Sequence, residues 1–228
     1  MYINALWITT IDSKGLKRGG KLELTNQEML ANVAKNANFS DSRVVAIKKL
    51  TNQNILFDLA INSDDFYVAL AAVEKLTDQK MLADVVKNAP FIYLKSSSQH
   101  RSVRITALDK LTDQKMLADV VKNAKGTTWS TIKDERVAAV EKLIDQKILI
   151  DIAENHKDKW VRKAAVEKLT DLKVLTMIMN GSEEKYVYTW TESGSYEVDS
   201  YGENSRTYND TYTIDLREIA RERLADLK

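Results

Sequence analysis

The amino-acid sequence predicts an all-α protein, an α-solenoid of about six two-helix repeats, with a β-hairpin inserted near the C-terminus. Three observations predict this fold class. The segment Lys75 to Ala89 recurs letter for letter from Lys110 to Ala124. Related segments recur along the chain at a basic spacing of 26 residues, and their apolar residues recur at helical intervals. One such repeat buries too little to fold alone, so we expect successive repeats to share a continuous core.

Each repeat is anchored on the leucine of a Leu-Thr-Asp motif or a close variant of it. The anchor leucines are Leu24, Leu50, Leu76, Leu111, Leu143, Leu169 and Leu224. Insertions lengthen three of the later gaps between anchors. The last anchor follows from an alignment without gaps of Val161–Lys173 on Leu216–Lys228.

The residues before each anchor predict the first helix of a repeat. An alanine lies four positions upstream of the anchor, at Ala46, Ala72, Ala107, Ala139, Ala165 and Ala220. An aliphatic residue lies three positions upstream, at Ile47, Val73, Leu108, Val140 and Val166. These positions form one stripe of a helix with the anchor, and the small alanine allows a neighbouring helix to approach closely.

The residues after each anchor predict the second helix. Its expected N-cap is the Asn or Asp two positions after the anchor, at Asn26, Asn52, Asp78, Asp113, Asp145, Asp171 and Asp226. Its expected end is an asparagine or glycine, at Asn36, Asn62, Asn88, Asn123, Asn155 and Gly181. Because both residue types tolerate the left-handed conformation, we expect a C-cap with positive φ at these positions.

Composition excludes several classes of protein. The chain has 228 residues, no cysteine, 44% hydrophobic residues and a net charge of +1 from 34 Lys plus Arg and 33 Asp plus Glu. It is therefore neither a disordered chain nor a disulfide scaffold. No window approaches the ~18 apolar residues of a membrane span, and the start lacks the regions of a signal peptide, so we expect a cytoplasmic protein without a membrane partner.

No pattern of residues indicates catalysis. The two histidines, His100 and His156, have no cysteine companions and no metal-ligand spacing. Motifs of phosphate-binding loops, serine hydrolases and zinc proteases are absent from the sequence. We therefore expect no catalytic residue, no metal and no cofactor, and a protein that is not an enzyme.

The segment from Lys159 to Asp171, with the pattern DxxVRxAAVEKLTDQ around it, resembles the HEAT-like repeats of bacterial proteins. The resemblance covers about residues 22–180 and 214–228. It implies a ladder between successive repeats, built from an arginine and a preceding aspartate. The arginine column is Arg43, Arg104, Arg136, Arg162 and Arg217, and Ala69 interrupts it. The resemblance also implies that the second helices line the concave side.

The exposed face of the second helices carries alternating charge. Lysines lie four positions after the anchor, at Lys80, Lys115, Lys147 and Lys173, and eleven after it, at Lys35, Lys87 and Lys122. Aspartates lie eight positions after it, at Asp58, Asp84, Asp119 and Asp151. Neighbouring Lys and Asp can pair on one helix, which leaves a solvated face as one interpretation. If the face binds a partner, its charge balance and lack of aromatic residues favour a protein segment over nucleic acid.

The insertions between a second helix and the next first helix are the other candidate surface. Two of them, Pro90–Gln99 and Gly126–Lys133, bring apolar or aromatic residues into connections. The third, residues 181–213, alternates around Tyr186–Thr191 and Thr207–Thr213 and predicts a β-hairpin. It holds six of the nine tyrosines and seven acids against Lys185 and Arg206. Its aromatic residues either recognise a partner or seal the end of the solenoid.

We therefore expect an N-terminal cap (1–21), repeats (22–180), an acidic Tyr-rich hairpin (181–213) and a final repeat helix (214–228). The expected function is that of a non-enzymatic protein-binding or scaffold module. The candidate partner-binding residues are Lys80, Asp84, Lys115, Asp119, Lys147, Asp151, Tyr186, Tyr188 and Trp190. Two alternatives from HEAT-like proteins remain open, namely nucleic-acid binding or base repair of the alkylpurine glycosylase type and a bilin lyase-like enzyme.

Overall fold

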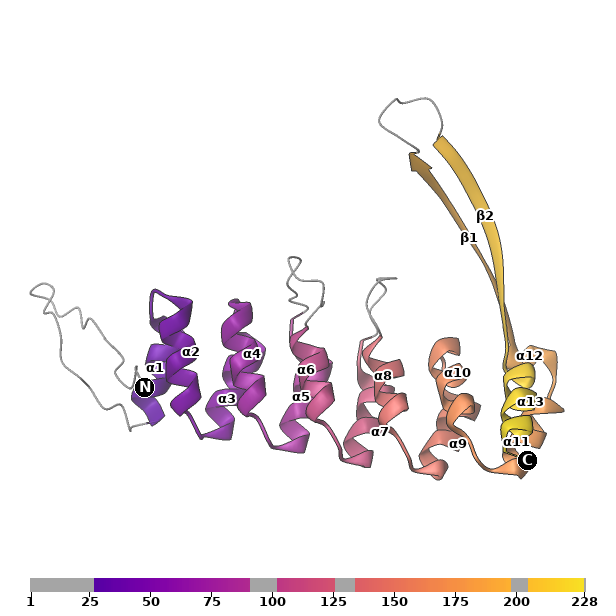
Figure 1. The fold of residues 1–228 in the computed structure, drawn as a ribbon, viewed down its shortest axis with the longest axis horizontal. Helices are drawn as coiled ribbons and strands as arrows, with labels where there is room; N and C mark the ends of the chain where they lie inside the picture. Colours follow the sequence, from indigo (N-terminus) through magenta and orange to yellow (C-terminus); the bar gives the residue numbers. More distant parts are fainter. Residues whose placement is uncertain (1–26, 91–101, 126–133, 198–204, 228) are drawn as a thin grey trace, which may run out of the picture. The chain divides into compact units, whose positions relative to one another are not determined.

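A computed structural model describes residues 27–90, 102–125, 134–197 and 205–227. The chain is an all-α helical-repeat protein, an α-solenoid whose helices pack in adjacent pairs, with one antiparallel two-stranded sheet near the C-terminus (Figure 1). The predicted fold class is thereby confirmed. Contacts divide the chain into two compact parts, Met1–Ala138 and Ala139–Lys228, named unit 1 and unit 2 below. The expected cap over residues 1–21 lies outside the described residues.

Unit 1 holds α1 (Gln27–Asn36), α2 (Ser40–Lys49), α3 (Gln53–Asn62), α4 (Phe66–Lys75), α5 (Gln79–Asn88), α6 (Val103–Lys110) and α7 (Gln114–Asn123). Helix α8 (Glu135–Lys142) runs across the boundary. Unit 2 continues with α9 (Gln146–Asn155), α10 (Lys159–Lys168), α11 (Leu172–Met179), α12 (Glu183–Tyr186), β1 (Val187–Glu197), β2 (Ser205–Asp215) and α13 (Leu216–Asp226).

The helices that pack closest are a second helix and the first helix that follows it. In unit 1 these pairs are α1 with α2, α3 with α4 and α5 with α6, and in unit 2 they are α9 with α10 and α11 with α13. Helices α2, α4 and α6 also contact one another in order, as do α1, α3, α5 and α7. The anchor motif therefore forms the turn that leads from one pair to the next, and the insertions lie inside the pairs.

The predicted stripes form the core. All six alanines of the first-helix column are fully buried, at 0% exposure. The anchors Leu50, Leu76, Leu111, Leu143 and Leu169 are also at 0%. Burial of each leucine contributes about 1.5–3 kcal/mol. Since each pair supplies only a few such residues, the contacts between pairs are required for stability.

The predicted N-caps of the second helices are confirmed wherever they lie in the described repeats before the last one. The side chains of Asn52, Asp78, Asp113, Asp145 and Asp171 each accept a hydrogen bond from a backbone amide of the first turn that follows. Asp65, Ser102, Asp158 and Asp215 cap first helices in the same way. Loss of such a cap costs typically ~1 kcal/mol.

The predicted left-handed C-caps are wrong. Asn62, Asn88, Asn123 and Asn155 are the last helical residues, and the residues that follow them have negative φ, such as −77° at Ser63. Gly181 does not have a positive φ either. The glycine is required for space instead, because a β-carbon there would collide with the ring of Tyr186.

The last repeat also departs from the predicted pattern. Helix α13 runs past the anchor Leu224, which is half-buried, and ends at Asp226. The expected N-cap role of Asp226 is therefore wrong, because Asp226 is itself the last helical residue of α13.

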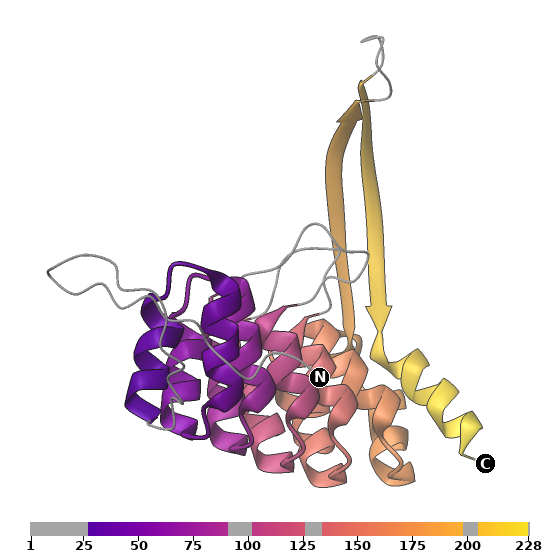
Figure 2. The same ribbon diagram turned by 60° about the vertical axis from the view of Figure 1, so that its left-hand side comes forward.

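The predicted hairpin is confirmed, with longer strands than the alternation indicated. β1 and β2 pair over their whole length, from Val187 opposite Asp215 to Glu197 opposite Ser205. Figure 2 shows the two strands side by side, extending away from the helices of unit 2. Tyr186 itself belongs to α12, at the base of the hairpin.

Within the described ranges, every helix is too short or too polar to cross a bilayer.

Candidate partner-binding surface

The second helices of unit 1 share an exposed face built from five positions after each anchor. Counted from the anchor leucine, positions 4 and 11 lie along one edge of this face, and positions 5 and 12 lie along the other edge. Position 8 lies between the two edges and is therefore central. We call this surface the charged face. On α5 and α7 it consists of Lys80, Met81, Asp84, Lys87 and Asn88, and of Lys115, Met116, Asp119, Lys122 and Asn123.

Ion pairs join the charged face from one helix to the next. Lys35 on α1 lies 2.5 Å from Asp58 on α3, between Nζ and Oδ2. The same distance separates Lys87 Nζ on α5 from Asp119 Oδ2 on α7. Lys87 also pairs with Asp84 on its own helix, at 2.9 Å. The sequence predicted pairs along one helix, and the structure adds pairs between successive helices.

The asparagines that end α1, α3, α7 and α9 donate to the residue four positions earlier, which is the central aspartate on α3, α7 and α9. The side-chain amide of Asn62 donates to Asp58 Oδ1 at 2.7 Å, and Asn123 donates to Asp119 Oδ1 at 2.7 Å. Asn36 donates in the same way to Asn32. In these helices the asparagine is therefore explained by a side-chain bond to the residue four positions earlier, and α5 is the exception, because Asp84 pairs with Lys87 there. This bond replaces the backbone role that the sequence predicted.

These bonds keep the paired groups charged. The bond from Lys35 lowers the pKa of Asp58 below its usual value, with Asn62 contributing in the same direction. The bond from Lys87 lowers the pKa of Asp119. Burial lowers the pKa of Lys87, but the bonds to Asp119 and Asp84 outweigh burial and raise it. The pKa shifts of Asp58, Asp119 and Lys87 therefore all favour the charged form of the group.

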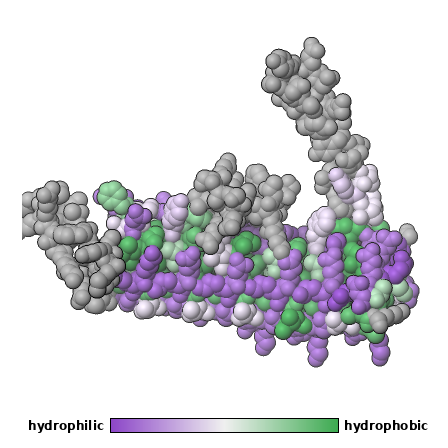
Figure 3. Space-filling model, viewed as in Figure 1, coloured by the Kyte–Doolittle hydropathy of each residue, from purple (hydrophilic) through white to green (hydrophobic). Residues whose placement is uncertain are grey.

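Two candidate lysines stay outside this pairing. Lys80 and Lys115 are exposed, and no described residue accepts a bond from either ammonium group. Beside them, Met81 and Met116 are partly exposed, and Met29 on α1 is 43% exposed. Unit 1 therefore presents free ammonium groups next to flexible apolar side chains. Figure 3 has the same view as Figure 1, in which the first helices of unit 1 face the reader, and a row of hydrophilic residues crosses these first helices.

The candidate residues of unit 2 do not repeat this arrangement. Lys147 and Asp151 on α9 are exposed, and Asp151 accepts from Asn155 at 2.8 Å. The next helix, α11, has Met177 where earlier repeats have the central aspartate, and this methionine is 47% exposed. Glu154 takes the position of the lysine that would pair with it. The aspartate is thus replaced by an uncharged residue and the lysine by an acid, so the ion pair of unit 1 has no counterpart at these two positions.

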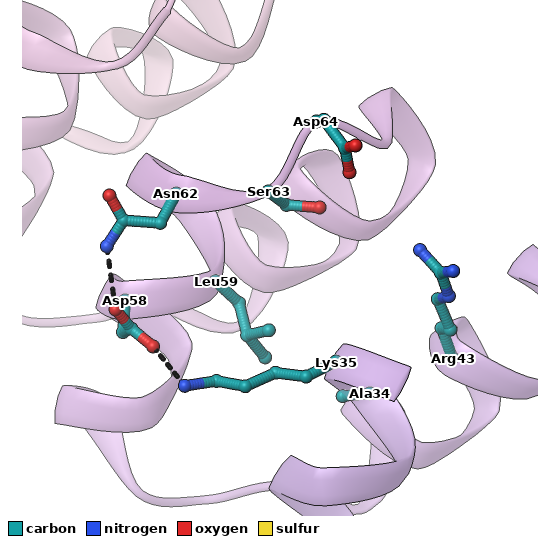
Figure 4. Close-up of a pocket in the computed structure, with 8 residues that line it drawn as sticks. All are labelled: Ala34, Lys35, Arg43, Asp58, Leu59, Asn62, Ser63 and Asp64. Carbon is teal, nitrogen blue, oxygen red and sulfur yellow. Dashed lines mark hydrogen bonds and ion pairs between the residues drawn. The ribbon is translucent and has the colours of Figure 1, made fainter. Parts of the chain in front are cut away.

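A cavity of about 260 Å³ opens in unit 1 at the C-terminal ends of α1 and α3. Its lining consists of Ala34, Lys35, Arg43, Asp58, Leu59, Asn62, Ser63 and Asp64 (Figure 4). The Lys35–Asp58 pair and the Asn62 bond form one wall of it. No sequence pattern singled out this cavity, because Asp64 occurs in only one repeat.

A row of glutamines at the anchor turns is the main feature that the sequence analysis missed. Gln53 donates to Lys75 O, and its carbonyl oxygen accepts from Thr77 N at 2.8 Å. Gln27 and Gln79 bond the following turns in the same way, and Gln146 does so in unit 2. The recurrence of glutamine directly after the anchor motif, as in Thr-Asp-Gln, is the sequence pattern that could have indicated this row.

A second row, of lysines just before the anchors, supports the first helices. The ammonium groups of Lys75 and Lys110 donate to the backbone oxygens of Lys48 and Glu74 in the preceding first helix. Lys168 donates likewise to Glu141 in unit 2, at 2.8 Å. Each lysine thus satisfies a carbonyl at a helix C-terminus, where a cation is favoured.

The arginine column also bonds between helices in unit 1. Arg43 Nε donates to Ala37 O at 2.6 Å, and its Nη1 lies 3.8 Å from Asp65 Oδ2. Arg104 makes the corresponding contact with Glu135, at 3.9 Å. Two other members of the column, Arg136 and Arg217, pair with the aspartates two residues before them, Asp134 and Asp215. Ala69, which interrupts the column, is buried.

In unit 2, Arg162 binds the base of the hairpin. Its side chain is 6% exposed, its Nη1 donates to Lys185 O at 3.0 Å and to the Tyr188 hydroxyl, and its Nε donates to Ala153 O. The rings of Tyr186 and Tyr188 lie 5.3 and 5.5 Å from the guanidinium, in cation–π contact.

Of these two candidate residues, Tyr186 packs inside unit 2, whereas Tyr188 is only half-buried. Tyr186 is 3% exposed, so it is not the exposed anchor that recognition would require. The side chain of Trp190 lies outside the described residues.

His156, the histidine among the described residues, bonds to the backbone of the turn between α9 and α10. His156 Nδ1 accepts from Asp158 N at 3.1 Å, after the end of α9. His100 lies outside the described residues. Across residues 27–90, 102–125, 134–197 and 205–227, no cluster of three His, Cys, Asp or Glu side chains forms a metal site.

Comparisons with protein-family models, with curated proteins and with solved structures find no match to this chain. Its class therefore follows from the fold: it is an all-α helical-repeat protein whose successive helices are joined by rows of side-chain bonds.

Proposed function

We propose that this protein is a non-enzymatic binding module of the HEAT-like type, which holds a polypeptide segment of a partner against the charged face of unit 1. One observation carries the proposal. The central aspartates Asp58 and Asp119 are held in pairs between helices, while Lys80 and Lys115 remain exposed beside methionines. Such a face offers both donors and adaptable apolar contact to a polypeptide.

Two further observations support the proposal. The segment Lys159–Asp171 resembles bacterial HEAT-like repeats, whose second helices line a concave side. The absence of cysteine in a chain of 228 residues fits a reducing compartment such as the cytoplasm.

A photo-crosslinking experiment tests which face binds. A benzophenone amino acid placed at Lys80 or Lys115 should crosslink the same partner, because both positions lie on the charged face. The matched controls are Lys48 and Glu74, which are exposed on the first helices α2 and α4. Equal crosslinking from all four positions would contradict the proposal, since a specific face cannot be contacted equally from both sides.

The unpaired lysines also favour a second candidate function, namely nucleic-acid binding. Lys80, Lys115 and Lys147 would contact phosphates, and the affinity would fall steeply with salt. The charged face supplies no aromatic residue for stacking, which makes this the weaker candidate. A duplex-DNA mobility shift at low salt that is lost on reversing the three charges would support it, and no shift would remove it.

A further inference from the structure

We infer that the cavity at the ends of α1 and α3 receives the side chain of an arginine or lysine from the bound polypeptide. The inference rests on the proposed function for the source of that side chain. The chemistry of the cavity itself is independent of the source, and a small probe can test it separately.

The cations that line the cavity are already engaged. Lys35 Nζ contacts Asp58 at 2.5 Å. Arg43 uses Nε on Ala37 O at 2.6 Å and holds Nη1 3.8 Å from Asp65. Figure 4 shows the Lys35 side chain extended along one wall toward Asp58, away from the open part near Asp64. An incoming anion would therefore compete with carboxylates already in place.

The polar groups left over near the opening are acceptors. Asp64 is exposed, and no donor among the described residues reaches its carboxylate. Asn62 uses its amide on Asp58, which leaves its side-chain oxygen available. The last turn of α3 adds backbone carbonyls, and a helix C-terminus favours a cation. A ligand that fits these groups must bring donors and positive charge.

Counting charges leads to the same result. Lys35 and Arg43 contribute two positive charges, and Asp58, Asp64 and Asp65 contribute three negative charges. Pairing Lys35 with Asp58 and Arg43 with Asp65 leaves Asp64 as the uncompensated group. Since a partner lysine or arginine would compensate it, binding should not break either existing pair.

The size and the floor of the cavity suit one long side chain. Its volume of about 260 Å³ is below the ~300–1,000 Å³ of pockets for drug-sized ligands. Ala34 and Leu59 are buried beneath it and offer apolar contact. Arginine and lysine place their aliphatic stems on such surfaces and keep the charged head among polar groups.

The test uses the full-length protein and Nα-acetyl-arginine methylamide, with the citrulline analogue as a neutral probe of the same shape. Binding is followed by shifts of backbone amide resonances in NMR spectra. We expect the arginine probe to shift the resonances of Asn62, Ser63 and Asp64 in a saturable manner. The citrulline probe should bind at least about fivefold more weakly, since it lacks the charge-assisted bond.

The variant Asp64→Asn keeps the size of the side chain and removes its charge. It should weaken the arginine probe by about fivefold or more and leave the citrulline probe unchanged. The control Glu222→Gln removes an exposed acid of unit 2 and should change neither affinity. Equal binding of the two probes to the unaltered protein, or shifts confined to other residues, would overturn the inference.

The two proposals fail in different ways. Probe binding at Asp64 without face-specific crosslinking would leave the cavity as a cation site and contradict the protein-binding function. Crosslinking from Lys80 and Lys115, with equal binding of the arginine and citrulline probes, would support the protein-binding function and overturn the cation site in the cavity.

Discussion

Lys87 Nζ lies 2.5 Å from Asp119 Oδ2, and the two residues belong to helices with the same ten-letter sequence, QKMLADVVKN. Identical helices therefore meet through different residues, the lysine of one copy and the aspartate of the next. Such a head-to-tail contact can repeat along a stack without closing on itself. This arrangement explains how two helices of identical sequence can be neighbours and still form a specific contact.

Removing the Lys87–Asp119 contact should destabilise the protein modestly. Asp119→Asn leaves Lys87 with Asp84 alone, and both partners are partly exposed, so we expect a loss of about 0.5–1 kcal/mol in the free energy of unfolding. Urea unfolding at pH 7 measures it. Glu222→Gln is the control, and an equal effect of the two substitutions would show that the contact contributes nothing.

The carboxylates with lowered pKa should make stability depend on acid. Asp58, Asp119 and Asp215 all have a pKa below their usual value, chiefly because of bonds from Lys35, Lys87 and Arg217. The native state then binds fewer protons than the unfolded state as these groups begin to titrate. Their contribution is present above the unfolded pKa and is lost as the pH falls through the lower native pKa.

Urea titrations between pH 7 and pH 2.5 should show this loss below about pH 4. The double variant Asp58→Asn, Asp119→Asn should show a smaller loss over the same range. Stability curves of equal slope for both proteins would contradict the assignment of the shifts to these aspartates.

The glutamine row should matter more than its exposure indicates. Gln53→Leu keeps the size of the side chain but leaves Thr77 N, Asp78 N and Lys75 O without their partner, and we expect a cost of about 1–2 kcal/mol. Asn54→Ala alters the next residue, whose side chain makes no bond to a described residue, and should cost less. Thermal unfolding followed by circular dichroism compares them, and an equal cost would contradict the role of the row.

The helical conformation of the terminal asparagines gives a further prediction. Asn62→Gly should destabilise the protein by about 1 kcal/mol, because glycine weakens a helix and the bond to Asp58 is lost. A left-handed residue would instead tolerate glycine without loss. An unchanged or increased midpoint of urea unfolding would therefore favour the left-handed C-cap that the sequence predicted.

The base of the hairpin should contribute more to the free energy of unfolding than its outer part does. Tyr186→Ala removes a buried ring from Arg162 and Gly181 and should cost about 3–5 kcal/mol. Replacing residues 190–212 by Asn-Gly joins Thr189 to Thr213, which lie opposite each other, through a two-residue turn. This shortened protein should lose less than about 1 kcal/mol. A similar loss in both would show that the whole hairpin acts as a seal.

Features that depend on local periodicity were predictable from the sequence. Ala72 and Leu76 recur at fixed places in the repeat, and helix geometry alone puts them on one buried stripe. Asp78 was predictable as an N-cap because its bond is made to the next turn of the same chain. These predictions needed no knowledge of how the repeats stack.

Features that depend on stacking were not predictable in the same way. Lys35 could pair with several aspartates, and only the packing of α1 on α3 selects Asp58. Asn62 suggested a backbone role because asparagine is common at left-handed C-caps, but the aspartate four residues earlier offered its amide a better acceptor. The cavity beside Asp64 arises where two helix ends meet, and one repeat read alone contains neither wall.

The glutamine-bonded turns lie at one end of the paired helices, and the helix ends that flank the connections of variable length lie at the other. Because Gln53 and Gln79 tie each turn to the next, the distance between neighbouring pairs is set at the turn end. Segments at the opposite end can then differ freely in length and character, as Pro90–Gln99 and residues 181–213 do. The helices and their glutamine-bonded turns are thus independent of the connections inside the pairs. Foreign loops could therefore be grafted into these connections without redesigning the helices.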